Sequence, residues 1–223
     1  MVATLPGRTQ GLGLITEPLL ADLRLDRVAY AEINLWATLI GAAFCIPFGR
    51  WMDRFGPRAV LAFLLAALGL SVIAMTFAHG PANLWLTITL TRGLGQSALS
   101  VVSIALVGKW FTERVNFAMG IYALLVAVVG AAVLAYGWRA SWLVTGLVIC
   151  GLAPLAWSFV RDPLVIVKDR ETESLEDLTL GDALRTGAFW TFALASAVFG
   201  LVYSGIALFN QSILEQRGFT AKD

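Results

Sequence analysis

Charged residues are scarce in this chain of 223 residues: they make up 14% of it, whereas hydrophobic residues make up 58% and the mean hydropathy is +0.77. A soluble domain needs more polar surface than this to cover its core, so the composition excludes a soluble globular protein. The net charge of +1 leaves no basic patch or stripe, and we therefore expect no nucleic-acid partner. The lipid bilayer is the partner that this composition predicts.

Histidine and cysteine are also nearly absent. The only histidine, His79, precedes Gly80 and Pro81 and is most simply a turn residue, so we expect no metal ion and no cofactor. Intramembrane proteolysis would need a serine–histidine pair or two membrane aspartates, and the apolar segments hold neither. Cys45 and Cys150 fall inside such segments, where a small apolar side chain fills space. The chain is therefore not expected to be an enzyme.

Long apolar runs stand where a soluble protein would alternate polar and apolar residues. Each run is about 20 residues long, enough to cross roughly 30 Å of hydrocarbon as a helix. We predict an all-α membrane protein whose first helical segment, at residues 11–23, is short. The full spans are expected at residues 33–48, 60–77, 84–107, 117–136, 142–160 and 189–209.

Residues 49–58 read Gly-Arg-Trp-Met-Asp-Arg-Phe-Gly-Pro-Arg and are expected to form a charged turn between two apolar runs. Charge is costly near hydrocarbon, so charged residues kept on a short interhelical turn indicate a gate between helices. The spacing resembles the signature loop between the second and third helices of major facilitator superfamily transporters, although Pro57 stands where that family usually has a basic residue. The matching residues, which the resemblance assigns to a gating motif, are Gly49, Asp53, Arg54, Gly56 and Arg58.

Weaker similarities extend along the whole chain. The segments Lys109-Trp-Phe, Ala118-Met-Gly, Gly137-Trp-Arg and Ala183-Leu-Arg-Thr-Gly-Ala-Phe-Trp resemble the monocarboxylate and oxalate/formate branch of this superfamily. The resemblance implies secondary transport by alternating access. The implied substrate is a small organic anion, a monocarboxylate or dicarboxylate, moved with a coupling proton or against a counter-transported anion.

The resemblance also divides the chain into three parts. Residues 1–160 are expected to form the N-terminal six-helix bundle of the major facilitator fold. Residues 161–187 are expected to form a cytoplasmic linker with a short amphipathic helix, and residues 188–223 the first helix of an incomplete C-terminal bundle. Internal repeats are typical of such transporters, and residues 11–20 align with residues 205–214 at an offset of 194 (205 − 11 = 194). The alignment predicts a truncated first helix.

A second hypothesis, from a different class, is a non-transporting truncated fragment or an assembly partner of a transporter. Alternating access rocks one bundle against another, so a single bundle with one extra helix is expected to give no transport alone. The partner would then be the missing C-terminal half or another copy of the chain. Sequence before Met1 and after Asp223 would separate the two hypotheses.

Arg92 is the sharpest candidate for a substrate contact. It lies inside a predicted span, and Gln96 and Ser100 follow it at helical spacing, so one face of this helix is polar. A guanidinium at this depth needs a polar environment, and its fork can bind both oxygens of a carboxylate. The alternative is structural: Arg92 pairs with a protein carboxylate or backbone carbonyls to hold helices together. Arg8 and Thr9 form a second candidate cluster, with a solvated terminus as the alternative for Arg8.

Lysine and arginine are distributed unequally between the two sides of the predicted bundle. The larger set lies on the side of residues 49–58, and by the positive-inside tendency this side is cytoplasmic. Residues 161–187 would share that side, and residues 78–83 would lie opposite. We therefore expect a multi-pass protein of the plasma (cytoplasmic) membrane, with the gating motif latching its cytoplasmic side.

Overall fold

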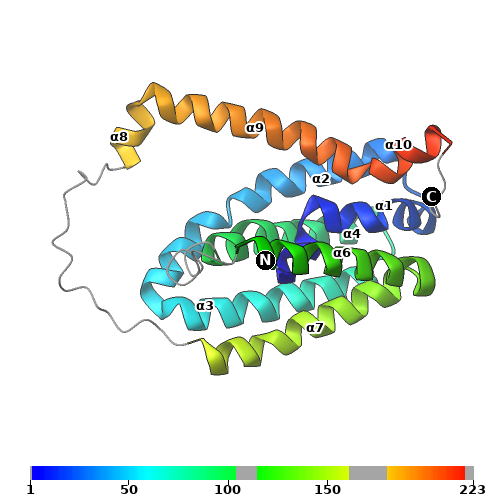
Figure 1. Cartoon of the computed structure of the whole chain (residues 1–223), viewed down its shortest axis with the longest axis horizontal. Coiled ribbons are helices and arrows are strands. Elements are labelled where there is room, and N and C mark those ends of the chain that lie inside the picture. The colour runs from blue at the N-terminus through cyan, green and yellow to red at the C-terminus, as the bar shows by residue number, and fades with distance from the viewer. Residues whose placement is uncertain (1, 104–114, 161–179, 219–223) are drawn as a thin grey trace.

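The computed structural model describes residues 2–103, 115–160 and 180–218, and within these ranges every regular element is helical. The long helices run along one common direction and form a bundle (Figure 1). In chain order the elements are η1 Val2–Gly7, α1 Thr9–Leu23, α2 Arg27–Ala42, α3 Cys45–Thr76, α4 Pro81–Thr91, η2 Arg92–Ala98, α6 Val115–Tyr136, α7 Trp138–Phe159, α8 Leu180–Arg185, α9 Gly187–Leu208 and α10 Asn210–Gln216.

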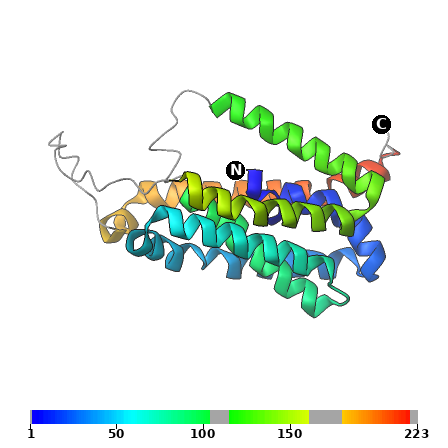
Figure 2. The same cartoon turned by 90° about the horizontal axis from the view of Figure 1, so that it is seen from below.

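Four helical stretches among the described residues are long and apolar enough to cross a membrane. Most of α6 forms a shorter apolar helix over Ala123–Tyr136 and lies as an outlying layer of the bundle (Figure 2). These helices confirm the all-α, multi-pass membrane fold predicted from the apolar runs. The four stretches are Arg27–Met52, Arg54–Thr76, Trp138–Phe159 and Gly187–Leu208.

The charged segment at residues 49–58 is mostly helical, which corrects the expectation of a turn. The helix α3 continues through Phe55 and breaks only at Gly56, whose φ of 79° and ψ of 156° suit a residue without a Cβ. Pro57 then restarts the helix at its first position, where a missing N–H costs nothing. Because Phe48 packs against Phe63 with ring centroids 6.3 Å apart, aromatic contacts hold the two arms of α3 together across this break.

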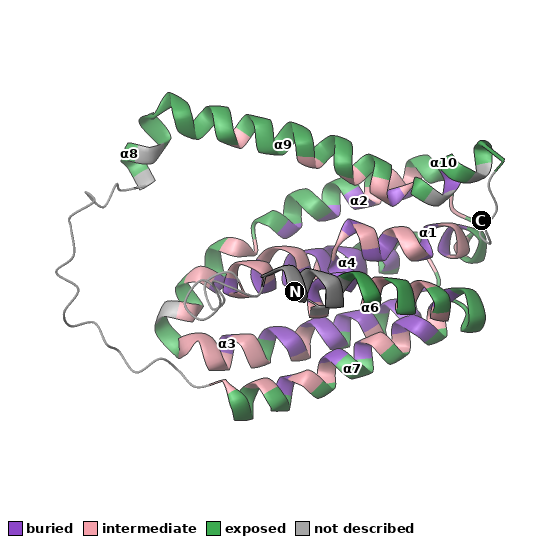
Figure 3. Ribbon diagram, in the orientation of Figure 1, coloured by how far each residue is buried: buried purple, intermediate pink, exposed green. Residues whose placement is uncertain are grey.

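The core draws buried residues from α1, α2, α3, α4, η2 and α7, and within it α3 and α7 pack along their length. Leu64 and Leu68 of α3 and Trp142 of α7 are completely buried, and Figure 3 shows the buried face running along both helices. Cys150 of α7 packs so closely on Gly69 of α3 that a Cβ at Gly69 would lie 2.5 Å from the sulfur. Small residues thus bring the two helices together, as in other membrane helix pairs.

The helix α9 lies at the edge of the bundle and is exposed along nearly all its length (Figure 3). It meets α1 through its last turns, and the two helices run parallel there. Gln10 donates to the Tyr203 hydroxyl at 2.7 Å, and the backbone of Gly13 lies against Ala207. These contacts join residues about as far apart as the repeat offset, as expected for a parallel repeat about an axis between two equivalent helices.

The linker expected at residues 161–187 lies largely outside the described residues. Within its described part, α8 covers Leu180–Arg185 and Asp182 stands in its first turn. Thr186 then caps α9 by accepting from the backbone N–H of Phe189 at 3.4 Å. The end of the bundle that carries residues 49–58 is called the motif end, and the opposite end is called the α10 end.

Candidate functional site

Arg92 lies at the start of η2, a π-helical segment that continues directly from α4. The segment contains Gly93 and Gly95, and the N–H of Leu99 bonds the carbonyl of Leu94 in the wider π-helical pattern. Single π-helical turns are found frequently at functional sites, because they rotate side chains away from regular helical positions. The Arg92 side chain is directed into the bundle, where only 3% of the residue is exposed.

The guanidinium of Arg92 donates to three neutral side chains. Its Nε and Nη2 both donate to Oδ1 of Asn34 on α2, at 3.2 and 2.6 Å. Its Nη1 donates to Oε1 of Gln96 at 2.9 Å and to Oγ1 of Thr9 at 3.5 Å. The structure therefore brings Arg92 and Gln96 of the first candidate cluster together with Thr9 of the second.

Neutral partners accept from all three nitrogens of the Arg92 guanidinium and leave its charge in place. The two ion pairs found among the described residues, Arg27–Glu17 and Arg139–Asp22, both lie at the α10 end. An isolated buried charge is costly unless it is paired, so this arrangement is unusual for a residue that only holds helices. The structural alternative, a protein carboxylate or backbone carbonyls around Arg92, is not what the described residues provide.

The remaining candidates lie close to this cluster along the chain but have different contacts. Ser100 donates to the carbonyl of Gly95 at 3.5 Å, within its own helix. Arg8 lies at the junction of η1 and α1, where its N–H bonds the carbonyl of Leu5 at 3.1 Å. Gly7 brings this junction against η2, because a Cβ there would lie 2.3 Å from the carbonyl oxygen of Thr91. The close approach is what positions Thr9 beside Arg92.

Asn34 is the site residue that the sequence analysis missed. It is 4% exposed, and its Nδ2 donates to the backbone carbonyl of Tyr30, one turn earlier, at 2.9 Å. Tyr30 is completely buried, and its hydroxyl lies close to the side chains of Asn34 and Thr16. The available signal was an amide in the middle of an apolar run, since polar groups inside membrane spans usually mark functional sites.

The residues of the gating motif lie at the motif end. The guanidinium of Arg58 lies 4.6 Å from the ring centroid of Trp157 on α7, and its Nε donates to the Trp157 carbonyl. Arg54 stacks over Phe55 at 5.5 Å. A Cβ at Gly49 would meet nothing within 4 Å, so no close helix approach explains this glycine. The side chain of Asp53 lies outside the described part of the structure.

The comparison with known protein families decides the identity of this bundle. The profile described as Major Facilitator Superfamily matches residues 9–222, which is nearly the whole chain. The chain belongs to the Major Facilitator Superfamily. A comparison with curated proteins gives no match. Membership in this superfamily makes the chain a membrane transport protein rather than an enzyme.

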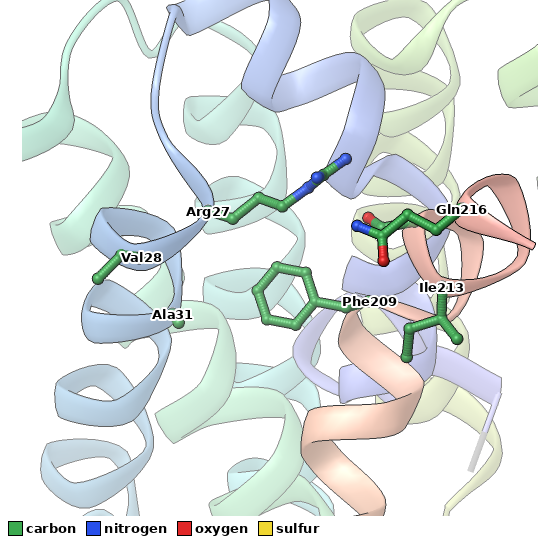
Figure 4. A pocket seen from close by; sticks show the side chains of 7 residues that line it. Arg27, Val28, Ala31, Phe209, Ile213 and Gln216 are labelled. Carbon is green, nitrogen blue, oxygen red and sulfur yellow. The ribbon is translucent and has the colours of Figure 1, made fainter.

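At the α10 end of this superfamily member, α1 contacts both α2 and α10. The Glu17 carboxylate accepts from Arg27, whose Nε and Nη2 lie 3.2–3.3 Å from it, and from the hydroxyl of Ser212. An open pocket beside this contact separates α2 from the junction of α9 and α10 (Figure 4). Its walls are largely apolar, and Phe209 projects into it between α2 and α10. Nothing in this pocket repeats the cluster of donors around Arg92.

Proposed function

We propose that this protein is a secondary transporter that moves a small organic anion, a monocarboxylate or dicarboxylate, by alternating access. The observation that supports it best is the buried guanidinium of Arg92, which neutral side chains surround in the described part of the bundle. An anion that enters this site would supply the missing negative charge. A guanidinium fork suits a carboxylate in particular, because two parallel hydrogen bonds form at once.

Gln96 and Thr9 complete the proposed binding site. They come from η2 and α1, and both accept from Nη1 of Arg92, so a bound anion would contact one edge of the guanidinium while they hold the other. In this superfamily fold the substrate site lies near the membrane midplane, where the repeated helices meet. The contact between α1 and α9 is such a meeting point, and α1 carries Thr9. A coupling proton or a counter-transported anion would balance the charge moved.

The gating motif is proposed to act at the motif end by holding the bundle in one of its two arrangements. Arg58 already joins α3 to α7 through Trp157. Asp53 is proposed to add the latch, since a carboxylate can pair with a nearby arginine and accept from backbone donors at a helix terminus. Because gating acts on the conformational step, Asp53→Asn in a full-length version of the protein is expected to slow transport in proteoliposomes far more than it weakens equilibrium binding. An unchanged transport rate at normal abundance would refute this latch.

The proposed anion site can be tested by equilibrium binding of radiolabelled oxalate, pyruvate and acetate to the purified chain in lipid nanodiscs. Arg92→Lys keeps the charge and loses the fork, so the affinity should fall, and Arg92→Gln should lower it further. Arg27→Gln is the matched control, because Arg27 is a half-exposed arginine at the α10 end. Unchanged binding in Arg92→Gln, or failure of the parent protein to bind all three anions, would overturn the proposal.

We also propose that the motif end faces the cytoplasm at the plasma membrane. Single cysteines at Asn83 and Asp169, in a variant without Cys45 and Cys150, should then react with impermeant reagents from opposite sides of the membrane. Labelling of both positions in sealed, right-side-out cells would contradict this orientation.

A further inference from the structure

Asn34 occupies the edge of the Arg92 guanidinium that a carboxylate normally occupies. Side-on pairing of arginine with a carboxylate uses two neighbouring N–H groups, and Nε with Nη2 forms one such edge. In this structure both groups converge on the single oxygen Oδ1 of Asn34, at 3.2 and 2.6 Å. The amide oxygen thus stands in the position of a carboxylate oxygen without its negative charge.

The orientation of the Asn34 amide is fixed from its other end. Its Nδ2 donates to the Tyr30 carbonyl at 2.9 Å, so its oxygen must face Arg92. Both residues are almost completely buried, which keeps water from serving as the acceptor. On the same face of α2, one turn earlier, the Tyr30 hydroxyl is buried close to the side chains of Asn34 and Thr16.

We propose that Asn34 is a neutral placeholder for the substrate carboxylate and thereby sets the specificity of the site for anions. This inference rests on the proposed function of Arg92. With the site empty, Asn34 satisfies the guanidinium donors and prevents the cost of leaving them unpaired. When an anion arrives, its carboxylate replaces Oδ1, because it can accept both parallel hydrogen bonds and adds a full negative charge, whose attraction to the guanidinium is strong where water is excluded. The charge of Arg92 is available to the ligand only because its resident partner has none.

The substitution Asn34→Asp tests this role directly. Aspartate has the same shape as asparagine but carries the charge that the ligand would otherwise bring, so it should form a permanent ion pair with Arg92. We expect the affinity for radiolabelled oxalate or pyruvate, measured in nanodiscs, to fall at least tenfold. Asn34→Ala removes the placeholder without adding a competing charge, so its affinity should fall less than that of Asn34→Asp.

Two controls separate the possible outcomes. The thermal unfolding midpoint of Asn34→Asp should equal or exceed that of the parent, because the added pair satisfies both groups, and loss of binding then cannot be attributed to misfolding. Arg92→Gln, measured in parallel, tests the site itself. If Arg92→Gln loses binding while Asn34→Asp loses less than tenfold, the placeholder is refuted and the anion site stands. A loss in Asn34→Ala as large as in Asn34→Asp would also refute it, since Asn34 would then be required for structure.

Discussion

The arginines at the α10 end have charged partners, whereas the arginine in the interior has neutral ones. At the α10 end, Arg27 and Arg139 are partly exposed, and each pairs with a carboxylate. In the interior, Arg92 is 3% exposed and has neutral partners in the described residues. Stability alone would favour the reverse, because a charge-neutralising partner matters most where water is absent. The difference supports the proposal that the outer arginines hold helices and that Arg92 binds a ligand.

The outer network, formed by Arg139, Trp138 and Asp22, shows how an arginine that joins helices is partnered in the same chain. Arg139 of α7 donates through Nε to Asp22 of α1 at 2.8 Å and through Nη2 to the carbonyl of Ala78 at 3.0 Å. Its third contact is the carbonyl of Thr76, at the end of α3. Trp138 adds an indole N–H to the same carboxylate at 3.1 Å. This network joins α1, α3 and α7, and both the N–H donors and the charge of Arg139 have partners in it.

The largest effect is expected from removing Arg92 and Asn34 together, as Arg92→Met with Asn34→Leu. Binding of radiolabelled oxalate should be lost, because the anion loses Arg92 as its partner, and truncating one member of a buried charge pair costs about 2–5 kcal/mol. The unfolding midpoint should fall only slightly, since apolar groups replace both members of the Arg92–Asn34 contact and only the bonds to Gln96 and Thr9 are lost without replacement. Nanodisc binding and thermal unfolding on the same sample measure both quantities. A strongly destabilised double variant would show that Arg92 is structural after all.

The next effect concerns the close contact that places Thr9 beside Arg92. In Gly7→Ala the new Cβ would lie 2.3 Å from the Thr91 carbonyl oxygen, so η1 must move away from η2. We expect a loss of about 1–3 kcal/mol in stability, typical of overpacking, together with weaker anion binding. Gly49→Ala is the matched control because a Cβ there meets nothing within 4 Å. Equal stability of the two alanine variants would contradict the close approach of η1 to η2.

Removing Arg139 should lower stability and leave anion binding unchanged, which is the opposite of the expectation for Arg92. Arg139→Gln removes the ion pair with Asp22 and weakens the contacts to two backbone carbonyls, and we expect a loss of about 1–3 kcal/mol in stability. The anion affinity should stay at the parent value, since this network does not touch the Arg92 cluster. Chemical and thermal unfolding measure the first quantity, and equilibrium binding measures the second. A parallel fall in affinity would show that the two regions are coupled.

The smallest effect is expected from Glu17→Gln. The side chain of Arg27 is 48% exposed, and exposed ion pairs contribute only about 0–1 kcal/mol. The glutamine oxygen can still accept from Ser212, so the contact between α1 and α10 should persist. Cross-linking by a short bis-maleimide between cysteines placed at Gln10 and Tyr203, whose side chains meet between α1 and α9, should therefore proceed as in the parent background. If the substitution abolished cross-linking, the charge of Glu17 would be essential to the joint between α1 and α9.

Sequence reasoning predicted the membrane helices and the family, because both depend on local patterns. Apolar length alone predicts a spanning helix, and the observed stretches Arg54–Thr76 and Gly187–Leu208 lie close to the predicted ones. The spacing in residues 49–58 pointed to the superfamily that the profile match shows. The same pattern was wrong about a turn, since only Gly56 leaves the helical conformation and the preceding residues remain helical through Phe55.

By itself, then, the sequence determined that this is a helical membrane transport protein of the superfamily and that an arginine lies inside one of its helices. Only the tertiary structure decided what surrounds that arginine. Asn34 and Thr9 lie 58 and 83 residues before Arg92, and no local pattern relates residues so far apart. Whether a buried charge meets a carboxylate or an amide depends on which helix faces it, and helix packing determines that.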